Sequence, residues 1–181
     1  APQGTLGYPQ QGRRLAVLGP DGPVPHDMPG VLGVARRDPG LTLGYWNAPD
    51  ETAARYQGDW FLTGDMVSMA ADGAITYLGR DDDMMNAGGF RVSPIEVERI
   101  MSSFPDLTEC AAAEVTVKEG TSVIALFYTA AQDLDNKALA EFANQSLARY
   151  KCPRLFQHID TLPRNPNGKV QRKLLRSISA G

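Results

Sequence analysis

The sequence GRDDDMMNAGGFR at residues 79–91 separates two parts of the chain that follow different patterns. It contains an arginine, three consecutive aspartates and a pair of glycines, with little apolar content to bury. Consecutive carboxylates repel one another and need solvent or cationic partners. A glycine pair permits backbone angles and close approaches that side chains forbid. We interpret this stretch as a functional hinge between two lobes. The alternative is a solvated loop in front of a helix.

The residues before the hinge predict a small β-rich part. Their apolar runs are short and end at Gly, Pro or Asp-Gly turns, a pattern typical of antiparallel strands. Sheets of this size rarely fold alone, so we expect this part to pack against chain outside the sequence. The sequence begins at Ala1 inside what reads as the body of a domain, so we expect a fragment of a longer protein. The predicted strands are residues 13–19, 31–36, 67–69 and 74–78, with one short helix at residues 49–56.

The residues after the hinge predict a compact part with helices and strands. Ser93, Pro94 and Glu96 are typical of a helix start, in which Ser caps free amides, Pro fills the first turn and Glu completes a capping box. Apolar residues recur at helical spacing through residues 134–150. The remaining pattern predicts strands at residues 110–117, 122–130 and 153–159, a polar loop at residues 162–169 and a basic helix at residues 170–178. The expected fold class is α+β, with a short antiparallel sheet flanked by helices.

Composition and charge argue against several classes of function. The 181 residues are 43% hydrophobic and 22% charged, with a net charge of -3, which disfavours broad nucleic-acid binding. Cys110 and Cys152 form neither a metal-ligand spacing nor a disulfide scaffold, which favours reduced thiols in the cytoplasm. Residues 123–131, the longest apolar run, are too short to span a membrane as a helix. The twelve residues from Asp81 to Val92 lack the ligand pattern of a calcium loop, because Asn86 stands in place of the glycine and Val92 in place of the final acid, and we expect no metal site.

Four motifs occur in a specific order along the chain. Together they resemble the carboxy-terminal part of the adenylate-forming enzymes, a superfamily that includes acyl-CoA synthetases, peptide-synthetase adenylation domains and luciferases. The resemblance covers most of the chain from about Gly30 onward. Each motif is weak alone, whereas four in register are specific. The motifs are GYWN at residues 44–47, WFLTGD at 60–65, the hinge sequence, and PRNPNGK at 163–169.

The resemblance implies roles for three residues at or before the hinge. Asp65 matches the acid that accepts hydrogen bonds from the nucleotide ribose, a task that suits two carboxylate oxygens. Arg80 matches an arginine near the same ribose and phosphate, where a planar, permanently charged group fits. Asp82 matches the residue about which the small domain rotates between two half-reactions. Judged without the family, Asp65 could be a turn or capping residue and Arg80 part of a surface ion pair.

The same resemblance implies two functional loops beyond the hinge. Gly88, Gly89, Phe90 and Arg91 match the loop beside the pantetheine tunnel of CoA-using members, where absent side chains leave room for a thin chain. Lys169 matches the catalytic lysine, whose cation stabilises the charge that builds when a carboxylate attacks the α-phosphate of ATP. If the resemblance is set aside, residues 88–91 are interpreted as a turn before a helix, and Lys169 as an exposed lysine in a basic tail. The sequence around Lys169 also resembles an acetylation site of CoA ligases, which implies a lysine acetyltransferase as a partner.

The resemblance implies that the full-length protein is an AMP-forming acyl-CoA synthetase. It would convert a carboxylic acid, ATP and CoA into acyl-CoA through an acyl-adenylate, with Mg²⁺ accompanying ATP. Residues 1–81 would be the carboxy-terminal β-rich piece of the large adenylating domain, and residues 82–181 its mobile lid. The family's ATP-phosphate loop and acyl pocket are not in this sequence, so we expect the isolated chain to be inactive. The alternatives are a carrier-protein-dependent or luciferase-type relative, and a non-catalytic binding module that acts in trans with a separate large domain.

Overall fold

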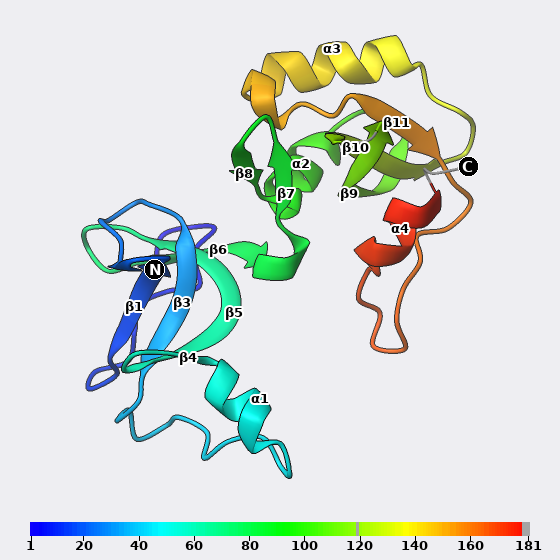
Figure 1. Ribbon diagram of the computed structural model, residues 1–181. Helices are drawn as coiled ribbons and strands as arrows, with labels where there is room; N and C mark the ends of the chain where they lie inside the picture. The colour runs from blue at the N-terminus through cyan, green and yellow to red at the C-terminus, as the bar shows by residue number, and fades with distance from the viewer. Residues whose placement is uncertain (119, 179–181) are drawn as a thin grey trace. The chain divides into compact units, whose positions relative to one another are not determined.

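The computed structural model describes residues 1–118 and 120–178 and divides into two compact units, Ala1–Asp82 and Asp83–Gly181. We call them unit 1 and unit 2 and describe each by itself (Figure 1). The division falls inside the sequence that we interpreted as a hinge. Helices and sheets occur in both units, so the α+β fold class is confirmed. No helix in the described part of the chain has the length and apolar character needed to cross a membrane.

Unit 1 is built on a six-stranded antiparallel sheet. The strand order is β2-β1-β3-β5-β4, and β6 pairs with β5 outside this path. Val17, Val67 and Ile75 form its buried core. The strands are β1 (Leu15–Gly19), β2 (Gly22–Pro23), β3 (Gly30–Ala35), β4 (Tyr56–Gln57), β5 (Trp60–Met69) and β6 (Ile75–Arg80).

The predicted strands of unit 1 are present, with shifted boundaries. The strand predicted at residues 67–69 is the end of the longer β5. Helix α1 (Pro49–Ala54) ends two residues earlier than predicted, because Tyr56 and Gln57 pair with β5 as β4. The predicted Asp-Gly turn does join β5 to β6, where the Asp72 carboxylate accepts a hydrogen bond from the amide of Ala74 at 3.0 Å.

Unit 2 contains a mixed three-stranded sheet in the order β11-β10-β9. Strands β9 (Leu107–Lys118) and β10 (Thr121–Ala130) are antiparallel, as predicted, but β11 (Leu155–His158) runs parallel to β10. The expectation of a purely antiparallel sheet was therefore wrong in this detail. The chain passes through helix α3 (Asn136–Ser146) between β10 and β11, and such a crossover returns the strand in the same direction.

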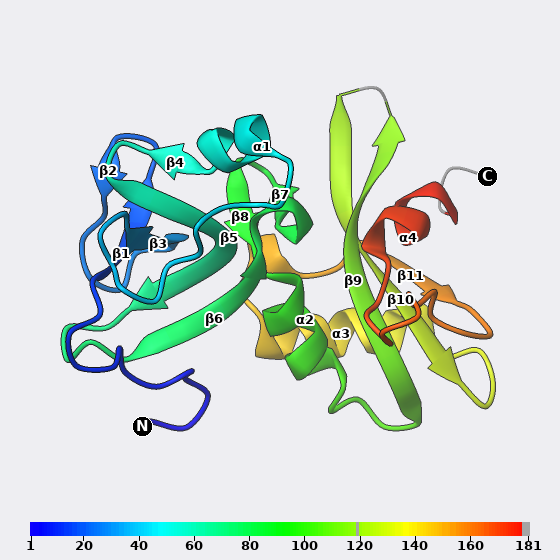
Figure 2. The ribbon, with the colours of Figure 1, turned by 90° about the horizontal axis from the view of Figure 1, so that it is seen from below.

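Both faces of the unit 2 sheet are buried, because alternate residues of β9 and β10 point to opposite sides. Ala112 and Leu126 belong to a core that packs under α2 (Pro94–Met101) and α3. Ala113 and Phe127 belong to a second core, which includes Leu175 of α4 (Arg172–Ile178). Figures 1 and 2 accordingly show α3 and α4 on opposite sides of the sheet.

The helix boundaries of unit 2 confirm one sequence signal and revise another. The Ser93 hydroxyl accepts a hydrogen bond from the amide of Glu96 at 3.2 Å, so α2 begins at the predicted cap. The helix predicted over residues 134–150 is shorter. α3 ends at Ser146, Leu147 is extended, and a separate 3-10 helix, η2 (Arg149–Lys151), follows.

Candidate functional site

Asp65 and Arg80 face each other across two neighbouring strands of unit 1. They are paired residues in the β5–β6 ladder, which places their side chains on one face of the sheet. Nη1 of Arg80 donates to Oδ1 of Asp65 at 3.0 Å and to the carbonyl of Thr63 at 3.1 Å. Burial lowers the pKa of Arg80, but the hydrogen bond and charge of Asp65 raise it above its ordinary value overall. About a third of each side chain is exposed, at 31% for Arg80 and 34% for Asp65, so a ligand can reach the pair.

Gly64 brings a second arginine to the same place. Its φ of 79° is a left-handed conformation that favours glycine. A Cβ built on Gly64 would lie 2.7 Å from Nη2 of Arg80 and 3.4 Å from Nη1 of Arg55, so both guanidinium groups approach this glycine. Sequence reasoning missed Arg55, because an arginine that follows a short helix carries no distinguishing signal. Two arginines, Arg55 and Arg80, therefore lie beside the Thr-Gly-Asp motif.

Asp82 is the last residue of unit 1 and lies in a 3-10 helix, η1 (Asp81–Asp83), that follows β6. Its side chain is 71% exposed, and its Oδ1 is 3.9 Å from Nε of Arg80. An ion pair of this length and exposure contributes little to stability. Asp82 is therefore an exposed polar residue at the division between the units.

The glycine pair forms the tip of a β-hairpin in unit 2. Strands β7 (Met85–Ala87) and β8 (Phe90–Val92) are antiparallel, with Ala87 opposite Phe90. Gly88 and Gly89 form the two-residue turn, with φ values of 57° and 86°. Positive φ at both central residues is what the favoured hairpin turn requires, and glycine adopts it without strain. No described atom lies within 4 Å of a Cβ built on either glycine, so the hairpin tip has open space around it.

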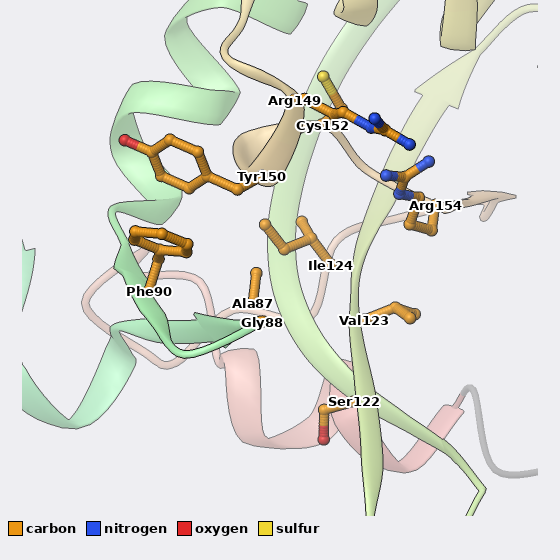
Figure 3. Close-up of a pocket in the computed structure, with 10 residues that line it drawn as sticks. All are labelled: Ala87, Gly88, Phe90, Ser122, Val123, Ile124, Arg149, Tyr150, Cys152 and Arg154. Atoms are coloured by element: carbon orange, nitrogen blue, oxygen red, sulfur yellow. The ribbon is translucent and has the colours of Figure 1, made fainter.

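A pocket of about 390 Å³ opens beside this hairpin (Figure 3). The rings of Phe90 and Tyr150 pack together, with centroids 4.6 Å apart and planes tilted by 32°. Figure 3 shows the guanidinium groups of Arg149 and Arg154 together on another side of the pocket. The full lining consists of Ala87, Gly88, Phe90, Ser122, Val123, Ile124, Arg149, Tyr150, Cys152 and Arg154. The pocket thus combines an aromatic pair, two cations and a hairpin tip without side chains.

Sequence reasoning identified Gly88 and Phe90 but missed Arg149, Tyr150 and Arg154. Arg149 and Tyr150 were missed because the periodic pattern places them at the end of a long helix, whereas the structure gives them a 3-10 turn of their own. Arg154 was missed because it lies in a segment predicted only as a strand. The spacing of cations around an aromatic residue in RYKCPR, residues 149–154, is a signal that could have found them. The predicted residue Arg91 is exposed on β8 and is not part of the pocket lining.

Lys169 lies at the end of a closely hydrogen-bonded loop. An isolated bridge pairs Arg164 with Val170 and closes the loop, and the amide of Asn165 donates to the carbonyl of Lys169 at 2.9 Å. The carboxamide oxygen of Asn165 accepts from the Lys169 amide at 2.8 Å, and Gly168 adopts a φ of 79°. The Lys169 side chain is exposed, and no ion pair in the described part of the chain engages its ammonium group.

The structure therefore brings some of the predicted site residues together and keeps others apart. Asp65 and Arg80 are in contact in unit 1, and Gly88 and Phe90 share a pocket in unit 2. Lys169 also belongs to unit 2 but does not line that pocket. Within residues 1–118 and 120–178, no group of three or more His, Cys, Asp or Glu side chains is placed to hold a metal ion.

Comparison with known proteins identifies the family. Residues 96–169 match the AMP-binding enzyme C-terminal domain. A 4-hydroxybenzoate–CoA/benzoate–CoA ligase of Rhodopseudomonas palustris is 36% identical over 185 residues, a match that covers 98% of this chain. The first of these matches places residues 96–169 in the family of AMP-binding C-terminal domains, and the relatives that match along nearly the whole chain are adenylate-forming ligases. The resemblance seen in its four motifs is thereby confirmed.

Solved structures of adenylate-forming enzymes share the fold. The anthranilate CoA ligase AuaEII, in complex with anthranoyl-AMP, matches with a TM-score of 0.85 and 29% identity over 98% of this chain and 35% of that one. The o-succinylbenzoate CoA synthetase of Bacillus subtilis, in complex with ATP and a magnesium ion, matches with a TM-score of 0.85 and 26% identity, covering 95% of this chain and 35% of that one. The chain spans about a third of the length of the relatives it matches.

Proposed function

We propose that this chain is the carboxy-terminal part of an ATP-dependent acid–CoA ligase that works through an acyl-adenylate. The observation that carries the proposal is the pocket beside Gly88, because its open hairpin tip, aromatic pair and two arginines fit a thin thiol-bearing chain with phosphates at its far end. Relatives that are named as CoA ligases support it.

The first half-reaction would use Asp65 and Arg80. A carboxylate substrate attacks the α-phosphate of ATP, pyrophosphate leaves, and an acyl-AMP forms. The Asp65 carboxylate suits the two hydroxyls of the ribose, and Arg80 already holds that carboxylate through a 3.0 Å hydrogen bond. The guanidinium group of Arg55 adds positive charge on the same side of Gly64, where an anionic nucleotide would benefit from it.

Lys169 would supply the cation for this first step. Negative charge builds on the phosphoryl oxygens and on the departing pyrophosphate, so an ammonium group placed there stabilises the transition state more than the ground state. The exposure of the Lys169 side chain is consistent with such a role, because the group is available to an external ligand.

The glycine hairpin would serve the second half-reaction. The thiol of CoA attacks the acyl carbonyl of the acyl-AMP, the thioester forms, and AMP leaves. The pantetheine chain would pass Gly88 and Gly89, where no side chain obstructs it. Arg149 and Arg154 would bind CoA phosphates, and Phe90 would offer a ring for stacking. Arg91, exposed on the same strand, would add charge near the entrance.

We assign residues 1–81 to the large adenylating domain and residues 82–181 to a mobile lid that turns at Asp82. An exposed aspartate tolerates a change of backbone angles better than a buried or β-branched residue. The phosphate loop for ATP is outside this sequence, so the isolated chain would not form acyl-AMP. Mg²⁺ would accompany ATP, but the described residues offer no cluster to hold it, and we assign none of them to the metal.

Acetylation of Lys169 would regulate the enzyme. The lysine is exposed at the end of a surface loop, and acetylation removes its positive charge. A full-length enzyme that is fully acetylated at Lys169 should lose acyl-AMP formation and keep thioester formation from supplied acyl-AMP. Unchanged acyl-AMP formation in that enzyme would contradict the regulation.

The choice of CoA as acceptor is tested by comparing CoA with pantetheine, which lacks the nucleotide and its phosphates. In the full-length protein, R149A/R154A should raise the KM for CoA about tenfold and leave the KM for pantetheine unchanged, because charged hydrogen bonds to phosphate are lost. K137A, which removes an exposed cation of α3, is the control. A protein that accepts a carrier-bound phosphopantetheine but not free CoA would instead be a carrier-dependent adenylation domain. Activity that requires a separately encoded large domain would identify a module acting in trans.

A further inference from the structure

Two arginines flank Lys169 in the sequence, Arg164 five residues before it and Arg172 three residues after it. In unit 2 each of them pairs with a glutamate from the body of the unit. The internal hydrogen bonds of the loop between Asn165, Gly168 and Lys169 use neither arginine side chain. The two ion pairs are therefore additional links between the loop and the rest of unit 2.

Arg164 joins the loop to the sheet. Its Nη2 is 2.6 Å from Oε1 of Glu109, which lies on β9. Its Nη1 donates to the carbonyl of Gly168, the residue before Lys169, at 2.8 Å. One guanidinium group thus spans from β9 across the loop to the neighbour of the lysine. Both side chains are about half exposed, so this contact fixes geometry more than it adds stability.

Arg172 holds the other side of the loop in a buried position. Its side chain is 9% exposed, and its Nη2 donates to both carboxylate oxygens of Glu98 at 2.8 and 2.9 Å. Glu98 extends from α2 and also accepts from the amide of Ala112 on β9 at 2.8 Å. Nη1 of Arg172 is 3.5 Å from Oδ2 of Asp83, the first residue of unit 2. The start of α4 is therefore tied to α2, to β9 and to the beginning of the unit.

Burial makes this second contact less sensitive to salt than the first. Desolvation raises the pKa of Glu98 above its ordinary value overall, although the positive charge of Arg172 opposes that rise. Ion pairs away from solvent are screened less by salt than exposed ones. A guanidinium group that binds both oxygens of a carboxylate also fixes orientation, which an ammonium group cannot do in the same way.

We propose that Arg164 and Arg172 are positioning residues that fasten the Lys169 loop to the body of unit 2 through Glu109 and Glu98. This inference rests on the proposed role of Lys169 in forming acyl-AMP. The lysine then travels with the unit as a whole, so its ammonium group reaches the nucleotide in a defined place. A loop that opens and closes independently is not required.

The test separates the two half-reactions in the full-length protein. R164A and E109Q should each slow acyl-AMP formation about fivefold, and R172K about tenfold or more, because small displacements of a charge near the reacting atoms cost rate. Thioester formation from supplied acyl-AMP and CoA should stay within about twofold of the wild type, since the pocket residues are untouched. K173A removes a neighbouring exposed cation and serves as the matched control.

Amide hydrogen exchange provides a readout that does not depend on activity. R164A should speed exchange at residues 165, 168 and 169, whose amides are hydrogen-bonded within the loop, whereas K173A should not. The exchanged-charge variant E109R/R164E should restore part of both the protection and the rate.

Three results would overturn the inference. They are equal slowing of both half-reactions in R164A and R172K, unchanged loop exchange in R164A, and faster loop exchange with an unchanged rate of acyl-AMP formation. Failure of the proposed function looks different: K169A would then make acyl-AMP as fast as the wild type. In that case the exchange experiment would still decide whether the arginines fasten the loop.

Discussion

The lysine loop, residues 163–170, and the glycine hairpin, residues 85–92, belong to the same unit but are built in contrasting ways. The lysine loop is closed by backbone hydrogen bonds and held by two Arg–Glu pairs. The tip of the glycine hairpin has open space around it, and its base is tied to β9 where the amide of Asn86 donates to Glu114 at 2.8 Å. In the proposed function, the segment that places one charge is fastened, whereas the segment that leaves room for CoA has a tip without side chains.

K169A should have the largest effect, and it should affect only the step assigned to the lysine loop. Acyl-AMP formation by the full-length protein should fall about 10²- to 10³-fold, because a charge that stabilises the transition state is removed. Single-turnover formation of acyl-AMP, followed by quench and chromatography, measures it. Thioester formation from supplied acyl-AMP should be nearly unchanged. An equal loss in both steps would contradict the assignment of the lysine loop to the first half-reaction alone.

G89A should produce the next largest effect, on the opposite half-reaction. Gly89 has a φ of 86°, which costs an alanine about 1–2 kcal/mol, and the added methyl group enters the space at the hairpin tip. Thioester formation should slow about tenfold while acyl-AMP formation persists. G73A tests the strain alone, because Gly73 has a φ of 89° and similarly open surroundings in the β5–β6 turn. A matching loss in G73A would show that strain, and not the place of the glycine, is responsible.

F90A should have a smaller effect that is confined to the pocket. The variant removes the ring that packs on Tyr150 at 4.6 Å, and aromatic pairs of this kind contribute about 0.5–1.5 kcal/mol. We expect a rise of about three- to fivefold in the KM for CoA, measured by steady-state kinetics at saturating ATP. Y150F keeps both rings and should retain the wild-type value. A changed KM for ATP would contradict the proposal that Phe90 contributes to CoA binding alone.

E114Q should show the smallest effect, because it weakens the base of the hairpin without touching its tip. The Glu114 carboxylate accepts from the amide and the side chain of Asn86, at 2.8 and 3.3 Å. Replacing a charged acceptor with a neutral one should slow thioester formation about twofold and speed amide exchange at residue 86. E141Q, an exposed change on α3, is the control. Faster exchange in the lysine loop of E114Q would show that the two segments are not independent.

Local signals in the sequence predicted most of the elements. The Ser-Pro-x-Glu start of α2, the Asp-Gly turn between β5 and β6 and the long apolar run of β10 each depend on neighbouring residues, so short windows suffice to find them. The direction of β11 was missed because it is set by the crossover through α3. The end of α3 at Ser146 was missed because Leu147 and Tyr150 continue the helical spacing without being in the helix.

Site residues that belong to a family motif were predicted from the sequence. Contacts between residues far apart in the sequence were not. The family motifs led to Asp65, Gly88 and Lys169. The direct pairing of Asp65 with Arg80 depends on a register shift in β5 next to Met66, which the pattern does not reveal. The fastening of the lysine loop by Arg164 depends on a glutamate 55 positions away, and no local window contains both.

Three consecutive alanines on β9, Ala111, Ala112 and Ala113, are fully buried between the two helical layers of unit 2. Their small size lets helices approach both faces closely. A bulkier residue at Ala113 would press toward Leu175 and displace the helix that follows Lys169, whereas one at Ala112 would press toward α2 on the other face. Substitutions at neighbouring positions of this strand should therefore shift different helices. A laboratory selection could change the packing on one face of the sheet and leave the other face unchanged.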